Sequence, residues 1–210
     1  MAILERRDSN AVAYLIMNAP ERLNALSDEM LSALQSTFDG LHNDRSVRAV
    51  VISGAGKAFC AGHDLKQITA TRQAEDGGAR AFKDLFDRCA TFMQSIQKIP
   101  QPVIAKVHGI ATAAGCQLVA SCDLAVATEG SRFGVNGVNI GLFCSTPMVA
   151  LSRNIQSKRA FEMLVTGEFM QASEAKEAGL VNRVVKEADL DAATQALAEL
   201  IATKPVSYTH

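Results

Sequence analysis

Residues 103–127 read VIAKVHGIATAAGCQLVASCDLAVA and contain the pattern that decides the fold. The β-branched run at 103–107 predicts a strand, the small-residue run at 113–121 predicts a short buried helix, and 124–127 predicts another strand. Both strands are apolar at nearly every position, which is typical of a sheet that is covered on both faces. Strands that alternate with helices in this way predict an α/β protein.

The same alternation continues toward the N-terminus. Strand-like runs at residues 11–17 and 48–53 flank a stretch in which Ser27 is the expected helix N-cap. Apolar residues then recur at spacings of three and four, which marks the buried face of a helix: Leu26, Met30, Leu34, Phe38 and Leu41. A strand, a helix and a strand in this order predict a right-handed crossover unit.

More helices are expected toward the C-terminus. A helix at 79–99 has one apolar side and is ended by Pro100 and Pro102. Shorter helices are expected at 161–166, 173–178 and 188–203, with Ser173 capping the middle one.

Composition excludes several classes of protein. The 210 residues are 48% hydrophobic and 20% charged, which is enough for a sizeable core and excludes intrinsic disorder. With 21 basic and 22 acidic residues, the chain has no general attraction to nucleic acid or to an anionic membrane. Five cysteines without metal-ligand spacing favour a reducing compartment over a disulfide framework. We therefore expect no nucleic-acid partner and no metal.

The location follows from what the sequence lacks. The N-terminus has no signal-peptide core, and the one long uncharged stretch, residues 133–152, is interrupted by glycine, proline and asparagine. We expect a cytoplasmic protein that does not enter a membrane, or a protein of the mitochondrial matrix if a removed leader preceded this chain.

Three glycine-bearing segments follow strands and precede helices: residues 53–66, 108–118 and 133–143. Each alone fits a turn, and none matches a nucleotide phosphate loop. The second segment opens a helix with small residues. The N–H groups of Ala114 and Gly115 at that helix N-terminus would face an anion or a developing oxyanion.

Several blocks, in order, resemble one family from near the start of the chain to about residue 185. They are residues 18–26 (NAPERLNAL), 58–66 (AFCAGHDLK) and 107–123, the pair Phe133-Gly134 with Gly141, and the pattern AxEAxxxGLV at 172–181. The chain resembles the enoyl-CoA hydratase/isomerase (crotonase) superfamily. The resemblance implies a crotonase-like spiral of repeated ββα units over residues 1–185. Residues 186–210 would begin a C-terminal helical region that is apparently truncated.

The resemblance also implies a site. Its ligand would be an acyl-CoA thioester, with the backbone N–H groups of His63 and Ala114 polarising the carbonyl oxygen and stabilising an enolate. It places CoA beside Arg22, Ala25, Ala61, His63, Asp64, Leu65 and Lys66. For Arg22 and Lys66 the alternative is a solvated surface charge. No separate cofactor is implied, since CoA is part of the substrate. A short C-terminal region would leave apolar surface uncovered, so we expect an oligomer, by resemblance a homotrimer or hexamer.

The chain departs from the family at the proton-transfer residues. Hydratases of this family carry two glutamates, and the matching positions here are Gln117 and Gly137. Neither residue titrates near neutral pH, so hydration by the usual route is in doubt. Three hypotheses stay open: an atypical enzyme of the family, a non-hydratase acyl-CoA-binding protein, and a different chemistry such as thioester hydrolysis that uses His63. A serine protease is disfavoured because no Ser/His/Asp set is evident.

Overall fold

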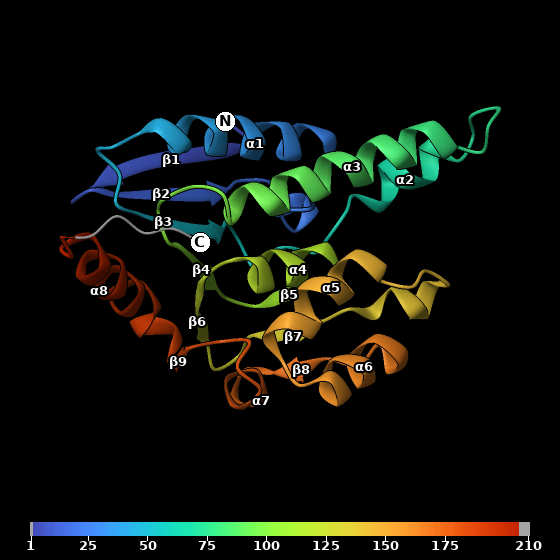
Figure 1. Ribbon diagram of the computed structural model, residues 1–210. Helices are drawn as coiled ribbons and strands as arrows, with labels where there is room; N and C mark the ends of the chain where they lie inside the picture. Colours follow the sequence, from blue (N-terminus) through green and yellow to red (C-terminus); the bar gives the residue numbers. More distant parts are fainter. Residues whose placement is uncertain (1, 206–210) are drawn as a thin grey trace.

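The computed structural model describes residues 2–205 and contains two sheets (Figure 1). The larger sheet has the strand order β1-β2-β3-β4-β6-β9. Strand β1 pairs antiparallel with β2, and every other neighbouring pair in this sheet is parallel. The bounds are β1 Leu4–Ser9, β2 Val12–Met17, β3 Ala49–Gly54, β4 Val103–Val107, β6 Leu124–Thr128 and β9 Arg183–Val185.

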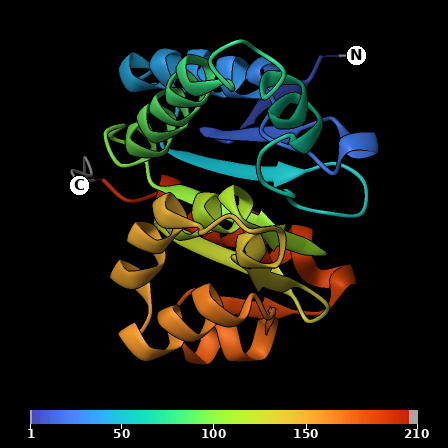
Figure 2. The ribbon, with the colours of Figure 1, turned by 90° about the vertical axis from the view of Figure 1, so that its right-hand side faces the viewer.

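The large sheet is buried on both faces, as predicted from its apolar strands. Successive residues of a strand point to opposite faces. In β3, Val50 and Ile52 belong to one hydrophobic core and Ala49 and Val51 to the other. Helices α1 (Asp28–Asn43) and α3 (Ala79–Ile96) contribute to the first core, and α8 (Leu190–Ala202) covers the second. Figure 1 shows α8 and α4 on opposite sides of β4 and β6, and Figure 2 shows α1 and α3 side by side above the first strands.

The smaller sheet lies where the chain turns back on itself. Its order is β5-β7-β8, with bounds Ile110–Thr112, Arg132–Gly134 and Met170–Gln171. After β4 the chain forms β5, which belongs to this sheet, and then α4 (Ala114–Ser121). After β6 it forms β7 of the same sheet, and then the 3-10 helix η2 (Asn136–Ile140) and α5 (Ser145–Asn154). Each turn of the chain thus adds one strand to each sheet, which confirms the predicted α/β fold of repeated ββα units.

The first crossover forms as the sequence predicts. Ser27 is the N-cap of α1, and its hydroxyl oxygen accepts from the N–H of Met30 at 3.2 Å. The five apolar residues expected on one face are all fully buried. Strands β2 and β3 on either side of α1 are parallel, as a crossover requires.

Three local expectations were incomplete or wrong. Strand β1 was not expected, because its sequence LERRDS is polar; it forms as the antiparallel edge strand beside β2. Helix α3 ends at Ile96 rather than at residue 99. Ser173 does not cap α7 (Ala172–Glu177), because the helix begins earlier. Glu174 instead accepts from the N–H of Gln171 at 2.9 Å, which is the geometry of a capping box.

The remaining elements complete the chain. They are η1 (Pro20–Arg22), α2 (Leu65–Thr71), α6 (Ser157–Thr166) and η3 (Glu187–Asp189). Within residues 2–205, no helix has the length and apolar character that crossing a bilayer requires, and no group of three or more His, Cys, Asp or Glu side chains could hold a metal ion. Of the C-terminal stretch, residues 206–210 lie outside the described part of the chain.

Candidate functional site

Two of the three glycine segments meet along residues 60–63. The carbonyl of Cys60 accepts from Thr112 N at 3.0 Å, and Ala61 N donates to Leu23 on the other side at 3.0 Å. The carbonyl of Gly62 then accepts from Leu26 N at 2.7 Å. In a trans peptide the C=O and the following N–H point in opposite directions. The N–H of His63 therefore points away from Leu26, toward the side on which residues 110–114 lie.

Helix α4 starts on this side with a strained turn. Its N-cap, Ala113, has φ 50° and ψ −121°, a conformation that L-residues rarely adopt and that costs of order 1–3 kcal/mol. The Ala113 carbonyl accepts from Gln117 N at 3.0 Å, so that carbonyl faces down the helix. Within residues 2–205, neither the N–H of His63 nor that of Ala114 donates to a protein acceptor. The fold thus leaves two main-chain donors unused at one place.

Glycines allow this close approach. A Cβ at Gly62 would stand 2.9 Å from Ala113 Cβ and 3.2 Å from Ala114 N, and Gly62 has φ 88°. A Cβ at Gly115 would stand 2.2 Å from the carbonyl oxygen of Cys60. Both distances are too short for a side chain. We refer to residues 60–63 and 112–115 together as the 63/114 corner.

A cavity of about 250 Å³ opens beside this corner. Side chains from α2, α3, η2 and the loop after η2 close it, and its surface is mainly apolar. Polar groups on the wall come from Thr112, Asn136 and Asn139. The other lining residues are Ala61, His63, Leu65, Ile68, Phe86, Ala113, Gly137, Ile140, Leu142 and Cys144. An apolar cavity with a few convergent polar groups is the usual form of a small-molecule site.

The His63 side chain packs inside this cavity. Its ring meets the Phe86 ring edge to face, with centroids 5.6 Å apart, and its Nδ1 is buried without a hydrogen-bond partner among the described residues. Burial lowers the pKa of His63; the Leu26 carbonyl and the charge of Asp28 oppose this shift. The ring is therefore neutral at pH 7.

Gln117 is not among the residues that line this cavity. It is 6% exposed and lines a separate groove of about 310 Å³ between α3, α4 and α5. Its Oε1 has no partner within the described chain. Gln117 and Gly137, the positions at which the resemblance places two glutamates, thus line two different concavities.

Gly137 lies on the cavity wall but has no room for a side chain. A Cβ there would stand 2.3 Å from the carbonyl oxygen of Leu142 and 2.8 Å from Cys144 Sγ. Leu142 N donates to the Gly137 carbonyl at 2.9 Å, which folds the loop back on itself. A glutamate at this position would require the backbone to move.

The cysteines are unsuited to nucleophilic catalysis. All five are free and buried. Burial raises the pKa of Cys144, the one that lines the cavity, although the Gly137 N–H opposes this. The thiol is therefore protonated at neutral pH and serves as an apolar wall group.

The residues predicted to hold CoA lie together beside the corner. The Asp64 carboxylate caps α2 by accepting from Lys66 N at 2.9 Å, and it lies 3.7 Å from the Arg22 guanidinium. Ala25 N donates to the Arg22 carbonyl at 3.1 Å. Leu65 is 54% exposed at the cavity. The structure therefore brings the two blocks 22–25 and 61–66 into one surface.

Asn24 is a structural residue that the sequence analysis did not single out. It is fully buried with φ 54°. Its amide donates to the carbonyls of Ala55 and Ala58, each at 2.8 Å, and accepts from Ala19 N at 3.0 Å. This side chain ties the loop after β3 to η1. Only its place in the matching block 18–26 could have pointed to it.

Two other polar residues, His108 and Asp123, have structural roles. His108 Nε2 bonds the Gly56 carbonyl at 2.7 Å. Asp123 accepts from Val103 N at 2.7 Å, which fixes the start of β4.

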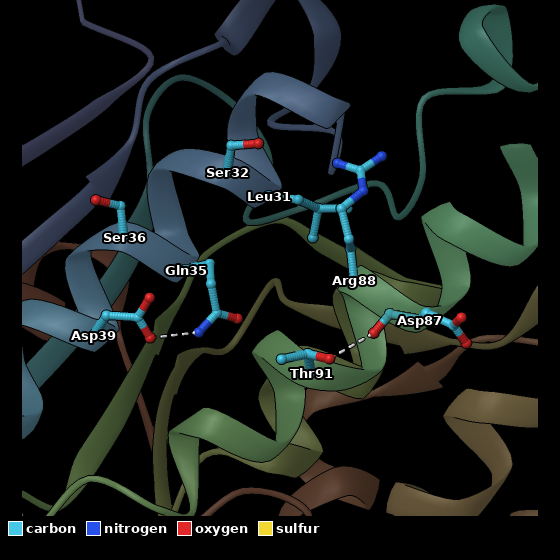
Figure 3. Close-up of a pocket in the computed structure, with 8 residues that line it drawn as sticks. All are labelled: Leu31, Ser32, Gln35, Ser36, Asp39, Asp87, Arg88 and Thr91. Atoms are coloured by element: carbon cyan, nitrogen blue, oxygen red, sulfur yellow. Dashed lines mark hydrogen bonds between the residues drawn. The ribbon is translucent and has the colours of Figure 1, made fainter.

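A further groove, of about 420 Å³, runs between α1 and α3 on the other side of α3 from α4 (Figure 3). Most of its polar side chains are already engaged, although Gln35 Oε1 has no partner within residues 2–205. Gln35 donates to Asp39 at 2.8 Å, and Thr91 donates to the Asp87 carbonyl at 2.8 Å. Arg88 pairs with Asp28 and Asp84. None of the residues that line the groove has a strained backbone or belongs to one of the three glycine segments, so we do not assign it a function.

Comparison with known proteins gives a consistent result. A family model described as enoyl-CoA hydratase/isomerase matches residues 7–209. Enoyl-CoA hydratase domain-containing protein 3, mitochondrial, from Homo sapiens is 46% identical over 199 residues. The match covers 94% of this chain and 63% of that relative.

Solved structures agree with the fold. An enoyl-CoA hydratase from Mycobacterium smegmatis is 55% identical with a TM-score of 0.93, covering 98% of this chain and 78% of that one. Human enoyl-CoA hydratase domain-containing protein 3 is 43% identical with a TM-score of 0.90, covering 96% and 78%.

Proposed function

The chain belongs to the enoyl-CoA hydratase/isomerase family, and on that premise we propose that it binds an acyl-CoA thioester and polarises its carbonyl with the N–H groups of His63 and Ala114. The observation that carries the proposal is the 63/114 corner, where two donors without protein acceptors meet beside an apolar cavity. Donors fixed before the reaction stabilise an enolate oxygen without reorganising. The acyl group would occupy the cavity, and CoA would lie along blocks 22–25 and 61–66.

The proton-transfer chemistry would be atypical for the family. Gln117 does not titrate and faces another groove, and Gly137 carries no side chain. General acid–base catalysis contributes about 10²–10⁴ in rate, so hydration would be slow by that factor. His63, neutral and on the cavity wall, is the one residue in this cavity that could accept a proton near neutral pH. We therefore propose an enzyme that resembles the enoyl-CoA hydratases/isomerases and turns over its substrate slowly.

A second candidate is an acyl-CoA-binding protein without hydratase activity. It is favoured by the loop at Gly137, which excludes a glutamate by a contact of 2.3 Å to backbone. The same donors and cavity would then serve for binding alone. Thioester hydrolysis with His63 as base is the alternative chemistry.

The test uses a conjugated 2,4-dienoyl-CoA, whose absorption moves to longer wavelength when its carbonyl is polarised. We expect the shift with the wild-type chain. We expect it to be lost in Ala114→Pro, because proline has no backbone N–H to donate. Any turnover of crotonyl-CoA should fall by about 10²–10³ in the same variant. Thermal unfolding checks that the variant folds. Binding without any shift in the wild-type chain would contradict polarisation at the corner.

Turnover separates the two candidate functions. Loss of the crotonyl-CoA absorbance above the uncatalysed rate supports the enzyme. A dienoyl-CoA shift with no turnover at any acyl chain length supports the binding protein.

The assembly and location belong to the same proposal. A homotrimer or hexamer is supported by exposed apolar side chains on α5 and α6, namely Met148, Val149, Phe161 and Val165. Light scattering after size-exclusion chromatography measures the mass, and a monomer would contradict it. The proposed location is the cytoplasm, or the mitochondrial matrix of a cell that imports the chain; the human relative carries the word mitochondrial in its name. We propose that no separate cofactor is needed.

A further inference from the structure

The polar side of the cavity contains a pair of side chains that the proposed function does not use. Thr112 ends β5, and Asn136 begins η2, directly after β7. Because β5 and β7 pair in parallel with Thr112 opposite Gly134, the two side chains come from adjacent strand ends. The Thr112 hydroxyl donates to Asn136 Oδ1 at 2.6 Å. Both residues line the 250 Å³ cavity.

This hydrogen bond fixes the orientation of the Asn136 amide. With Oδ1 engaged by Thr112, the Nδ2 group is the free end of the amide, and within residues 2–205 it donates to no protein acceptor. An amide Nδ2 carries two N–H donors and has no accepting lone pair. The rest of the wall from η2 and the loop after it consists of the Asn139 amide, the apolar Ile140 and Leu142, and the protonated thiol of Cys144. The cavity therefore offers a fixed neutral donor.

We propose that Asn136, positioned by Thr112, is a specificity-determining residue that recognises an oxygen substituent on the acyl chain, as in 3-hydroxyacyl and 3-oxoacyl thioesters. The proposal rests on the proposed function, since it takes the acyl group to occupy this cavity. A neutral donor cannot move a proton, but it stabilises an oxygen that is already present on the ligand. A ligand without that oxygen leaves the donor unpaired once water is excluded. The cost of that unpaired donor discriminates more strongly between ligands than the gain from the hydrogen bond itself.

Calorimetric titration with butyryl-CoA and 3-hydroxybutyryl-CoA tests this, because the two ligands differ by one oxygen. We expect the wild-type chain to bind the hydroxylated ligand about tenfold more tightly, the size of one well-made hydrogen bond. Asn136→Leu should abolish the preference, so that the two ligands bind with equal affinity. Thr112→Val should reduce the preference to about threefold or less, because Asn136 is then free to turn. Thr112→Ser, which keeps the hydroxyl, should restore it.

The outcomes separate the two proposals. Equal affinity for both ligands in the wild-type chain overturns the role of Asn136 and leaves acyl-CoA binding intact. An undiminished preference in Asn136→Leu or in Thr112→Val overturns it as well. No binding of either ligand contradicts the proposed function itself. If Asn136→Leu does not fold, Thr112→Val and Thr112→Ser carry the test with Asn136 in place.

Discussion

The 63/114 corner and the loop at residues 136–144 bound the same cavity but are built differently. At the corner the functional groups are backbone amides, and packing against buried residues such as Cys60 and Ala114 fixes them. The loop presents side chains, and several of them, including Ile140 at 64% and Leu142 at 41%, are exposed. Backbone donors survive changes of side chain as long as the packing is kept. Side-chain chemistry can change one residue at a time.

Gly115→Ala gives the largest effect expected and breaks the corner. The new Cβ would stand 2.2 Å from a buried backbone oxygen that cannot yield without moving the segment at Cys60. We expect a loss of about 3 kcal/mol in the free energy of unfolding and loss of acyl-CoA binding. Urea unfolding and calorimetry measure both. Gly40→Ala is the matched control, because nothing lies within 4 Å of its added Cβ; it should raise stability by about 0.5–1 kcal/mol. If Gly115→Ala changed neither the free energy of unfolding nor acyl-CoA binding, the corner would not be rigid.

Gly137→Ala sharpens the comparison, because its contact of 2.3 Å is nearly as short but lies in the partly exposed loop. The loop at Leu142 can shift into solvent, so we expect only about 1 kcal/mol of destabilisation, with weaker acyl-CoA binding. The same urea unfolding measures it. Equal losses in Gly115→Ala and Gly137→Ala would show that the two regions are equally rigid and would remove the distinction drawn between them.

The smallest effect concerns pH. Burial lowers the folded-state pKa of His63 below its unfolded value, so protonation is disfavoured in the folded chain. The stability that this provides is complete above the unfolded pKa of about 6.5 and is lost as the pH falls toward the folded pKa. Stability measured by thermal unfolding should therefore decline between pH 7 and pH 5, and less so in His63→Leu. His42→Asn, at the exposed end of α1, is the control. An equal decline in wild type and His63→Leu would contradict a buried neutral ring.

Much of the architecture could be read from local sequence. The period-two burial of β3 and the capped, amphipathic α1 follow from strand alternation and helix periodicity, which are properties of a few neighbouring residues. The polar strand β1 could not be read in this way, because its partner β2 decides its conformation. The predicted cap of α7 was wrong for a similar reason: the helix begins at Ala172, one residue before Ser173, with Gln171 as its N-cap.

For the site, the sequence determined which residues are available: small residues at 112–115, a histidine at 63, an amide at 117 and a glycine at 137. Tertiary structure alone decided where they face. It placed Gln117 in a groove apart from the cavity, packed the His63 ring against Phe86, and joined Thr112 to Asn136 across two strand ends. The physical reason is that orientation depends on contacts between segments far apart in the chain. Hydrogen bonding and close packing set those contacts only when both segments are in place.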